Sequence, residues 1–527
     1  MAISLQIFSE VTGRNMVTRI LGALLALIAW LSATPASADW HEASSNHFVI
    51  YADQSPEQLR KFADRLERYH RGLEIILDED RPKPSPSSRV TVYMVRNDAE
   101  VRKLQGNKKS FVQGFYMPRA GGSVAFVPET ISGSADSMDP YRILFHEYAH
   151  HFLIGSTAEN YPLWYSEGFA EFLSSVKFER DGGIGLGAPA NHRGPELMLA
   201  KSVPIERLLD TAGYLKSKTK VYDEFYGRSW LLFHYLTISG QRKGQITTYL
   251  RALRGGKSEA EAAAEAFGDL GLLDKELDKY LRQPRMNYLP IAADKLKIGE
   301  IAIRKLDKAE AAAMPVVLRS KRGVDEVTAR LVLPDARAVA ALYPQHPAVL
   351  SALAEAEFDA GNDAAAITAA DKALAIAPNN INAHLQKGYA LARMMAAADD
   401  PAKAATGVRA QFLKVNAIEN DHPIPLIRFY MTFRESGREP TKNAIEGIEW
   451  ALTLAPHDQG LRMMVAGQQM QDDRFADAKA TLLPLANNPH ASSLTAAANA
   501  LLDKARERQA AEEQAAIAAP ASKAATK

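Results

Sequence analysis

A chain of 527 residues exceeds what one hydrophobic core usually supports, so two or three domains are expected. Its 63 Lys and Arg residues nearly balance 62 Asp and Glu residues, which argues against nucleic acid or an acidic membrane surface as the main partner. The chain has no cysteine, so thiolate metal sites are excluded, and any metal must be held by His, Asp and Glu.

Residues 1–38 have the features of a bacterial-type secretory signal peptide. Two arginines precede an apolar run, residues 20–31, that is too short to span a bilayer comfortably. Small residues at 36–38 then stand where signal-peptide cleavage requires them. We predict cleavage before Asp39, a periplasmic or secreted protein, and no stable membrane span after cleavage. An uncleaved anchor or a buried helix is the alternative.

The next part of the chain carries strand signals first and helix signals afterwards. Alternating apolar residues predict strands at 46–53 and 89–95 and a strand pair within 111–128. Ser55 and Pro56 predict the start of an amphipathic helix that ends near Leu77. This order predicts an α+β domain over residues 39–285.

Helices fill the second half of that domain. Two are predicted at 140–154 and 162–174, and the clearest later segments are 221–238 and 258–281. Residues 286–310 are predicted to be a linker, in which IGEIAI is either a short strand or a helix start.

The region after the linker is rich in alanine and repetitive. Pro344 and Pro378 close similar segments 34 residues apart, which is the tetratricopeptide period. Another repeat closes at Pro456, with the excess residues assigned to an insertion at 395–403, and a degenerate repeat is expected at 311–344. Residues 311–490 thus resemble the tetratricopeptide family, which implies an all-α solenoid; an unrelated helical bundle is the alternative. For 491–527 we predict a helical end and a disordered Ala/Lys-rich tail.

The helix predicted at 140–154 contains His146-Glu147-Tyr148-Ala149-His150, an H-E-x-x-H pattern. Residues four apart share one face of a helix, so the two imidazoles can converge on one ion. Glu147 then lies beside the metal, where it can take a proton from a bound water. A third ligand, Glu167, is expected to return on the next helix. Two nitrogens and one carboxylate oxygen suit one Zn²⁺ ion with an open fourth position.

Glu171 follows Glu167 by one helical turn. It is predicted to accept the remaining N–H of a ligand histidine, and the alternative is an ordinary exposed acid. Gly168 carries no side chain and is expected to let the two helices approach closely. His151 points away from His150 around the helix and is not expected to be a ligand.

HEYAH followed by WYSEGFAEF resembles the gluzincin clan of metallopeptidases, more narrowly the bacterial peptidase MA-like domains. The resemblance implies a zincin-like domain in which His146, His150 and Glu167 bind zinc and Glu147 is the general base.

The same resemblance implies a tyrosine that stabilises the transition state. Tyr226 fits best, with Tyr222 and His234 as rivals and a core role for Tyr226 as the alternative. GGSVAFVPE lacks the amine-binding G-x-M-E-N signature, which favours an endopeptidase over an aminopeptidase. Residues 123–127 would be the edge strand that pairs with extended substrate.

These features predict an exported zinc metallopeptidase that cuts a protein or peptide substrate. The repeats would recruit that substrate or a protein partner in their groove. The alternative is an inactive or non-peptidase scaffold in which the repeats mediate protein–protein interaction. A zinc hydrolase acting on a non-peptide bond is the third hypothesis.

Overall fold

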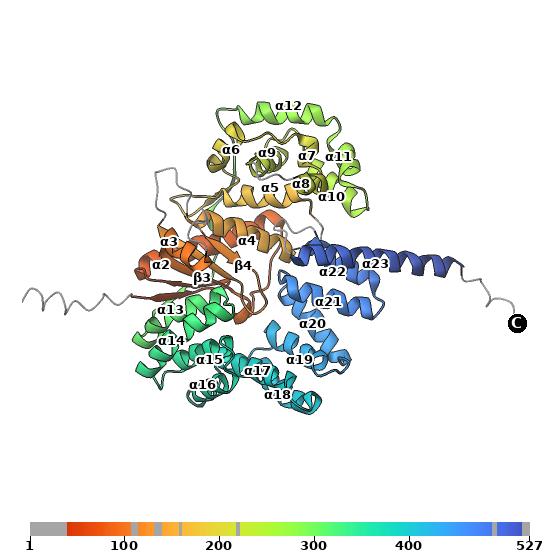
Figure 1. Cartoon of the computed structure of the whole chain (residues 1–527). Helices are drawn as coiled ribbons and strands as arrows, with labels where there is room; N and C mark the ends of the chain where they lie inside the picture. The colour runs from red at the N-terminus through yellow and green to blue at the C-terminus, as the bar shows by residue number, and fades with distance from the viewer. Residues whose placement is uncertain are drawn as a thin grey trace, which may run out of the picture.

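The computed structural model describes residues 39–106, 114–130, 140–156, 161–217, 222–486 and 493–518 (Figure 1). The predicted signal peptide, residues 1–38, lies outside the described residues. In the described ranges the chain is mainly helical, and its strands form a six-stranded and a three-stranded sheet. None of the helices described has the length and apolar character needed to cross a membrane.

The larger sheet is mixed, with strand order β4-β5-β3-β2-β1-β9. Strands β2, β3 and β5 run parallel, and the other three are antiparallel to their neighbours. Its strands are β1 (His41–Ser44), β2 (Phe48–Ala52), β3 (Val90–Asn97), β4 (Phe115–Met117), β5 (Val124–Thr130) and β9 (Ala302–Lys305).

Two predictions about this sheet are wrong. Residues 123–127 were expected to form an edge strand, but β5 pairs with β3 on one side and β4 on the other. Residues 286–310 were expected to be a linker, but β9 pairs with β1, with Ser44 opposite Ala302. Of the two alternatives for IGEIAI, the strand is observed, although β9 includes only its last two residues. The part of the chain that contains this sheet, called the first unit below, therefore extends to β9.

Helices cover both faces of the sheet. On one face lie α2 (Pro56–Leu77) and α4 (Pro140–Ser156), whose apolar side chains share a core with β2, β3 and β5. On the other face lie α3 (Asp98–Gln105) and α13 (Lys308–Arg322). Ser55 Oγ accepts a hydrogen bond from the backbone N–H of Gln58, which caps α2 as its sequence predicts.

A helical lobe follows α4 and stands above it in Figure 1. The three-stranded sheet and three 3-10 turns complete this first unit. Its elements are α5 (Leu163–Ser174), α6 (Gly194–Leu199), α7 (Ile205–Leu208), α8 (Thr211–Ser217), α9 (Phe225–Ile238), α10 (Gln245–Arg254), α11 (Glu259–Phe267), α12 (Leu270–Leu281), β6 (Lys177–Phe178), β7 (Ile184–Leu186), β8 (Leu289–Ile291), η1 (Pro86–Ser88), η2 (Asn191–Arg193) and η3 (Ala293–Lys295). The segment predicted as one helix at 258–281 is two helices, because Gly268 adopts φ +70° and Asp269 caps α12.

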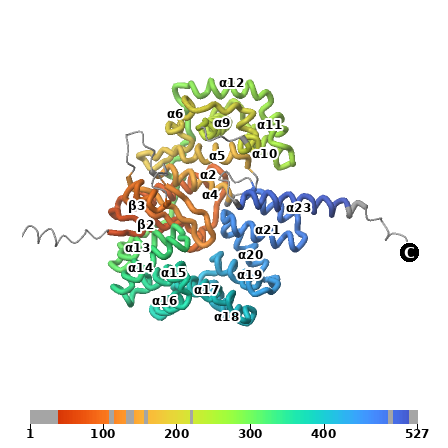
Figure 2. The backbone as a smooth tube through the Cα atoms, viewed as in Figure 1, coloured from red at the N-terminus to blue at the C-terminus, as the bar shows by residue number. Residues whose placement is uncertain are grey.

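Among the described residues, five helical hairpins form the solenoid, as the 34-residue period predicts. They curve under the sheet from α13 until α22 lies beside the first unit (Figures 1 and 2). Besides α13 they contain α14 (Glu326–Leu342), α15 (Pro347–Asp359), α16 (Asp363–Ile376), α17 (Ile381–Ala396), α18 (Pro401–Ile418), α19 (Pro423–Glu435), α20 (Lys442–Leu454), α21 (Gln459–Gln471) and α22 (Phe475–Ala486). The third hairpin, α17 and α18, has long helices of 16 and 18 residues, which accommodate the predicted insertion.

Small residues pack the helices of the second hairpin together. Ala354 of α15 and Ala369 and Ala370 of α16 are buried in one cluster. A final helix, α23 (Ser493–Ala518), follows the hairpins. A helical end is predicted for this segment, and the helix extends far into the part expected to be a disordered tail, to Ala518, since alanine has the highest helix propensity.

Candidate metal centre

Helices α4 and α5 bring the three predicted ligands together. His146 and His150 lie one turn apart on α4, and α5 packs against α4 so that Glu167 returns to them. Their ligand atoms are mutually close: Nε2 of His146 lies 3.2 Å from Nε2 of His150. Oε2 of Glu167 lies 3.4 Å from His146 Nε2 and 3.5 Å from His150 Nε2.

These three distances match one face of a tetrahedron around a metal ion. With metal–ligand bonds of about 2.0–2.1 Å, two ligand atoms of a tetrahedral zinc site lie about 3.3 Å apart. Two imidazole nitrogens and a carboxylate oxygen are also a donor set that zinc accepts. Within the described part of the chain, this is the single group of three His, Asp or Glu side chains with metal-ligand spacing.

Glu167 shows why a cation fits here. Its side chain is 1% exposed, and neither carboxylate oxygen has a hydrogen-bond partner. Burial favours the protonated acid, but the neighbouring His150 and His146 outweigh it and lower the pKa of Glu167. A buried carboxylate without hydrogen bonds is costly unless a positive charge lies against it.

The second nitrogen of each ligand histidine is held by its own partner. Nδ1 of His146 lies 3.1 Å from Oε1 of Glu171, as predicted, and Nδ1 of His150 lies 3.2 Å from Oγ of Ser166. These contacts orient both rings so that Nε2 faces the third ligand. Glu171 is 2% exposed, so the alternative of an ordinary exposed acid is not what the structure shows.

Glu171 is fixed in turn by side chains that the sequence did not reveal. His192 Nε2 lies 2.8 Å from Oε2 of Glu171, and the Arg193 guanidinium donates to Oε1. Burial opposes the charge of Glu171, but the hydrogen bonds with His146, His192 and Arg193 lower its pKa well below the ordinary value. Arg193 also donates to Glu196, at 2.8 Å. The segment ANHRGPE, which contains His192 and Arg193, has no motif in the sequence that predicts a contact with Glu171. The contact arises only because the fold brings this segment next to α5.

The three candidates for the tyrosine position separate clearly. Tyr226 lies in the first turn of α9, and the charge of Glu167 is the largest cause that raises its pKa. Tyr222 is 67% exposed and donates to Glu196 instead. His234 is fully buried in the core, where its Nε2 faces the carbonyl oxygen of Gly187 at 3.0 Å. Tyr226 is thus the candidate whose pKa responds to the charge of a predicted ligand, Glu167.

Two other predicted residues lie on α4 and α5. Glu147 is half-buried beside His146. Gly168 was expected to let α5 approach α4, but it faces α9: a Cβ there would lie 2.5 Å from the Ser229 carbonyl oxygen. His151 turns away from the ligands, as predicted, and its Nδ1 lies 2.7 Å from the Tyr116 hydroxyl.

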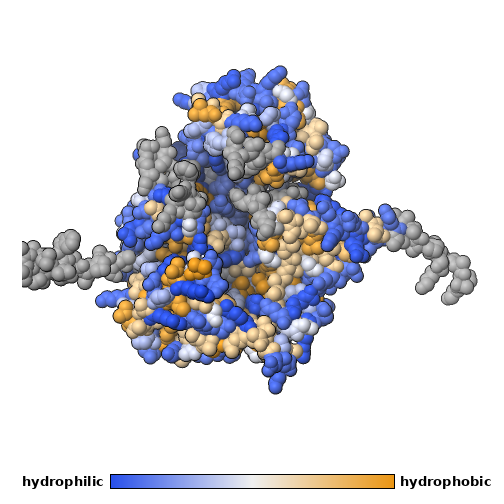
Figure 3. Space-filling view, viewed as in Figure 1, coloured by the Kyte–Doolittle hydropathy of each residue, from blue (hydrophilic) through white to orange (hydrophobic). Residues whose placement is uncertain are grey.

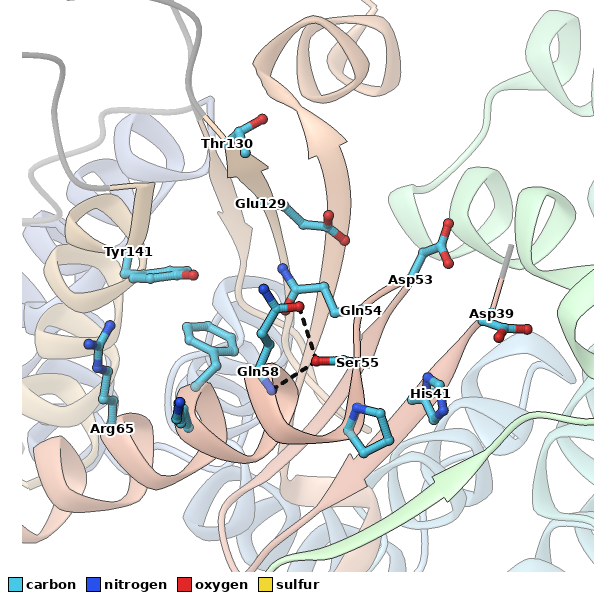
Figure 4. A pocket seen from close by; sticks show the side chains of 13 residues that line it. Asp39, His41, Asp53, Gln54, Ser55, Gln58, Arg65, Glu129, Thr130 and Tyr141 are labelled. Carbon is cyan, nitrogen blue, oxygen red and sulfur yellow. Dashed lines mark hydrogen bonds between the residues drawn. The ribbon is translucent and has the colours of Figure 1, made fainter. Parts of the chain in front are cut away.

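The surface has two further features. Figure 3 shows hydrophilic side chains around a hollow between the upper helical lobe and the rest of the molecule. A different pocket opens at the ends of β1, β2 and β5 and the start of α2 (Figure 4). Acidic and basic side chains such as Asp53, Glu129 and Arg65 line it, and none of the predicted site residues does.

No protein-family model and no curated protein matches the chain. Solved structures do match. A thermophilic TPR protein from Thermus thermophilus is 15% identical over 37% of this chain and 98% of its own, with a TM-score of 0.32. A tetratricopeptide repeat protein from Parabacteroides merdae is 12% identical over 52% of this chain and 88% of its own, with a TM-score of 0.29.

These findings correct the predicted family and activity. The matching structures are tetratricopeptide-repeat proteins, and no metallopeptidase was found among them. The assignment to the gluzincin-type metallopeptidases, the zincin-like peptidase domain and the endopeptidase activity are therefore withdrawn. A motif on two helices defines a set of ligands and not a reaction. The positions of Glu147 and Tyr226 likewise do not define a reaction.

Proposed function

We propose that the chain is an interaction scaffold that binds a protein partner through its helical repeats. The observation that carries the proposal is the solenoid itself, whose second helices present large apolar side chains to solvent. Leu331 on α14 is 67% exposed, and Leu413 on α18 and Trp450 on α20 are each 51% exposed. Tryptophan is enriched among the residues that contribute most of the binding energy at protein interfaces. Stacked repeats offer an extended surface for such a partner.

Quantitative co-purification tests the scaffold. The variant L413S/W450S removes the two apolar side chains from neighbouring second helices, and we expect it to lose a partner that wild-type protein retains. The matched control is M198S/L199S on α6, where Met198 is 80% and Leu199 84% exposed but the repeats are untouched. A partner lost equally from both variants, or from neither, would contradict the proposal.

The proposed scaffold carries one zinc ion on His146, His150 and Glu167. The spacing of the three ligand atoms and the unbonded, buried Glu167 oxygens support this part of the proposal. The ion would take over from the protonated imidazoles as the positive charge next to those oxygens. Metal analysis of purified protein is expected to give one zinc per chain and none in H146A/H150A. H346A, which removes a histidine of the solenoid that pairs with Asp307, is the control and should keep its zinc.

We further propose that the protein works outside the cytoplasm, on the strength of the signal-like residues 1–38. Fractionation of the native host and sequencing of the mature N-terminus test this. The expected mature chain begins at Asp39; a full-length chain in the cytoplasm would contradict export.

A further inference from the structure

The turn of residues 119–123, between β4 and β5, reaches from the sheet into the solenoid. Ala120 is 7% exposed and shares a core cluster with Tyr430 and Leu461 of the repeats. Its backbone N–H donates to Oδ2 of Asp458 at 2.7 Å. Oγ of Ser123 lies 3.0 Å from Nε2 of His457. The turn thus has apolar and polar contacts with the residues just before α21.

The backbone of the turn is shaped for this position. Gly121 and Gly122 have φ angles of +75° and +114°, which residues with a side chain rarely adopt. A Cβ on Gly121 would lie 2.7 Å from Cγ1 of Ile424. Arg119 anchors the start of the turn by donating to the carbonyl oxygen of Lys321 at 2.8 Å. Small residues at 120–122 are therefore required both by the turn and by the repeats.

A second loop of the first unit contacts the repeats beside the turn. The backbone N–H and the hydroxyl of Ser87 both donate to Oε1 of Glu419, at 2.9 and 2.6 Å. The hydroxyl of Ser85 donates to the carbonyl oxygen of Asp421 at 3.1 Å. Glu419 and Asp421 precede α19, as His457 and Asp458 precede α21. The repeats hold the first unit through the loops that lead into two successive first helices.

The same contacts reach helix α4, which carries two of the metal ligands. The ring of His151 lies 4.3 Å from the ring of His457, centroid to centroid. Tyr116, three residues before the turn, bonds to Nδ1 of His151 through its hydroxyl. His151 directly follows His150 in the chain. The repeat residue His457, the β4–β5 hairpin and α4 are therefore packed against one another.

We infer that Ile424, His457 and Asp458 form a binding site of the repeats for the chain's own 119–123 turn, and that its occupation holds α4 in place. The part that concerns the metal ligands rests on the proposed zinc centre. A partner that takes this site must present the same chemistry, a turn of small residues with a free backbone N–H. Such a partner would displace the turn and loosen α4.

Hydrogen exchange of the full-length, metal-free protein tests the inference. Asn caps helices as well as Asp does, so D458N keeps the cap of α21 while it removes the acceptor for the Ala120 N–H. D458N/H457A also removes the ring that contacts His151. The matched control is D400N, since Asp400 caps α18 and has no contact with the turn.

We expect amides of β4, β5 and α4 to exchange about tenfold faster in D458N/H457A, with a smaller increase in D458N, and no change there in D400N. Exchange in α9 and α10 should stay at the wild-type rate, which shows that the variants are folded. Release of zinc to a chelator should accelerate about tenfold as well. Wild-type exchange in α4 of both variants would overturn the inference. A wild-type protein that holds no zinc would defeat the zinc proposal but leave the exchange result to decide the contact between turn and α4.

Discussion

Oε1 of Glu171 lies 3.1 Å from Nδ1 of His146, and the same carboxylate is held by His192 and Arg193. Glu171 is not one of the three predicted ligands, but these contacts fix it behind His146, which is one of them. Burial disfavours the charged form of His146, but Glu167 and Glu171 outweigh it and raise the pKa of His146 to about 10. A metal ion must displace that proton from Nε2, while Glu171 keeps the ring oriented.

The first prediction concerns that contact. E171Q keeps the shape of the side chain but removes its charge, so it should weaken zinc binding by about 10- to 100-fold without abolishing it. Competition with a fluorescent zinc chelator measures the affinity. E276Q alters an acid that pairs with Arg242 on the far side of the helical lobe and should bind zinc like the wild type. Equal affinity in both variants would show that Glu171 does not support the site.

A second prediction uses zinc as a stabilising ligand. A metal that binds the folded chain alone stabilises it by about 2.7 kcal/mol when its free concentration is 100 times its dissociation constant. The melting temperature of the wild type should therefore rise with zinc and fall back with chelator. E167Q replaces the buried ligand carboxylate and should lose most of this zinc-dependent rise. An undiminished rise in E167Q would place the zinc elsewhere.

The third prediction compares two glycines inside helices. A Cβ at Gly168 would lie 2.5 Å from the backbone oxygen of Ser229, so G168A must push α5 away from α9 and should destabilise the protein by about 1–3 kcal/mol. Around Gly447 on α20 the nearest atom would be 3.9 Å away, so G447A should stabilise it by about 0.5–1 kcal/mol. Denaturant unfolding measures both. The prediction fails if the two variants shift stability in the same direction.

Sequence patterns predicted the elements with local signals. The Ser55-Pro56 start fixed α2, and the distance from Pro344 to Pro378 gave the period of the hairpins. Helical spacing also predicted that His146 and His150 lie together. Glu167 could be added because the next helix, joined by a short connection, has few ways to pack against the first. Of the three candidates for the tyrosine position, the preferred one, Tyr226, is the one whose pKa the charge of Glu167 raises.

Long-range contacts left no such signal. β9 is four residues long, and three of them are exposed, so it lacks the alternation of apolar and polar residues that predicts a strand. Its partner, β1, lies more than 250 residues earlier, so closeness in the sequence does not predict the pairing either. The side chains that bind Glu171, and the repeat residues that surround Gly121, likewise depend on how loops far apart in the sequence pack together. The error about activity had another origin: a resemblance confined to two helices was extended to a whole domain and its reaction.

The fourth prediction concerns pH and the core histidine of α9. Burial lowers the pKa of His234 from 6.5 to about 4, although the carbonyl oxygens of Gly187 and Asn287 oppose the shift. The unfolded chain thus takes up a proton near pH 6.5, and the folded chain does so only near pH 4. Above pH 6.5 both states are neutral at this position, so it contributes no pH dependence. As the pH falls from 6.5 to about 4, proton binding by the unfolded state lowers the free energy of unfolding by about 3 kcal/mol.

H234Q should remove this dependence, whatever its packing cost at neutral pH, so the slope of stability against pH is the quantity to compare. Urea unfolding at half-unit steps between pH 4 and 8 gives that slope. H346Q, on the solenoid and outside this core, should retain the full loss of stability on acidification. If H234Q and the wild type lose stability in parallel below pH 6.5, His234 is protonated in the folded protein, and its burial does not keep it neutral.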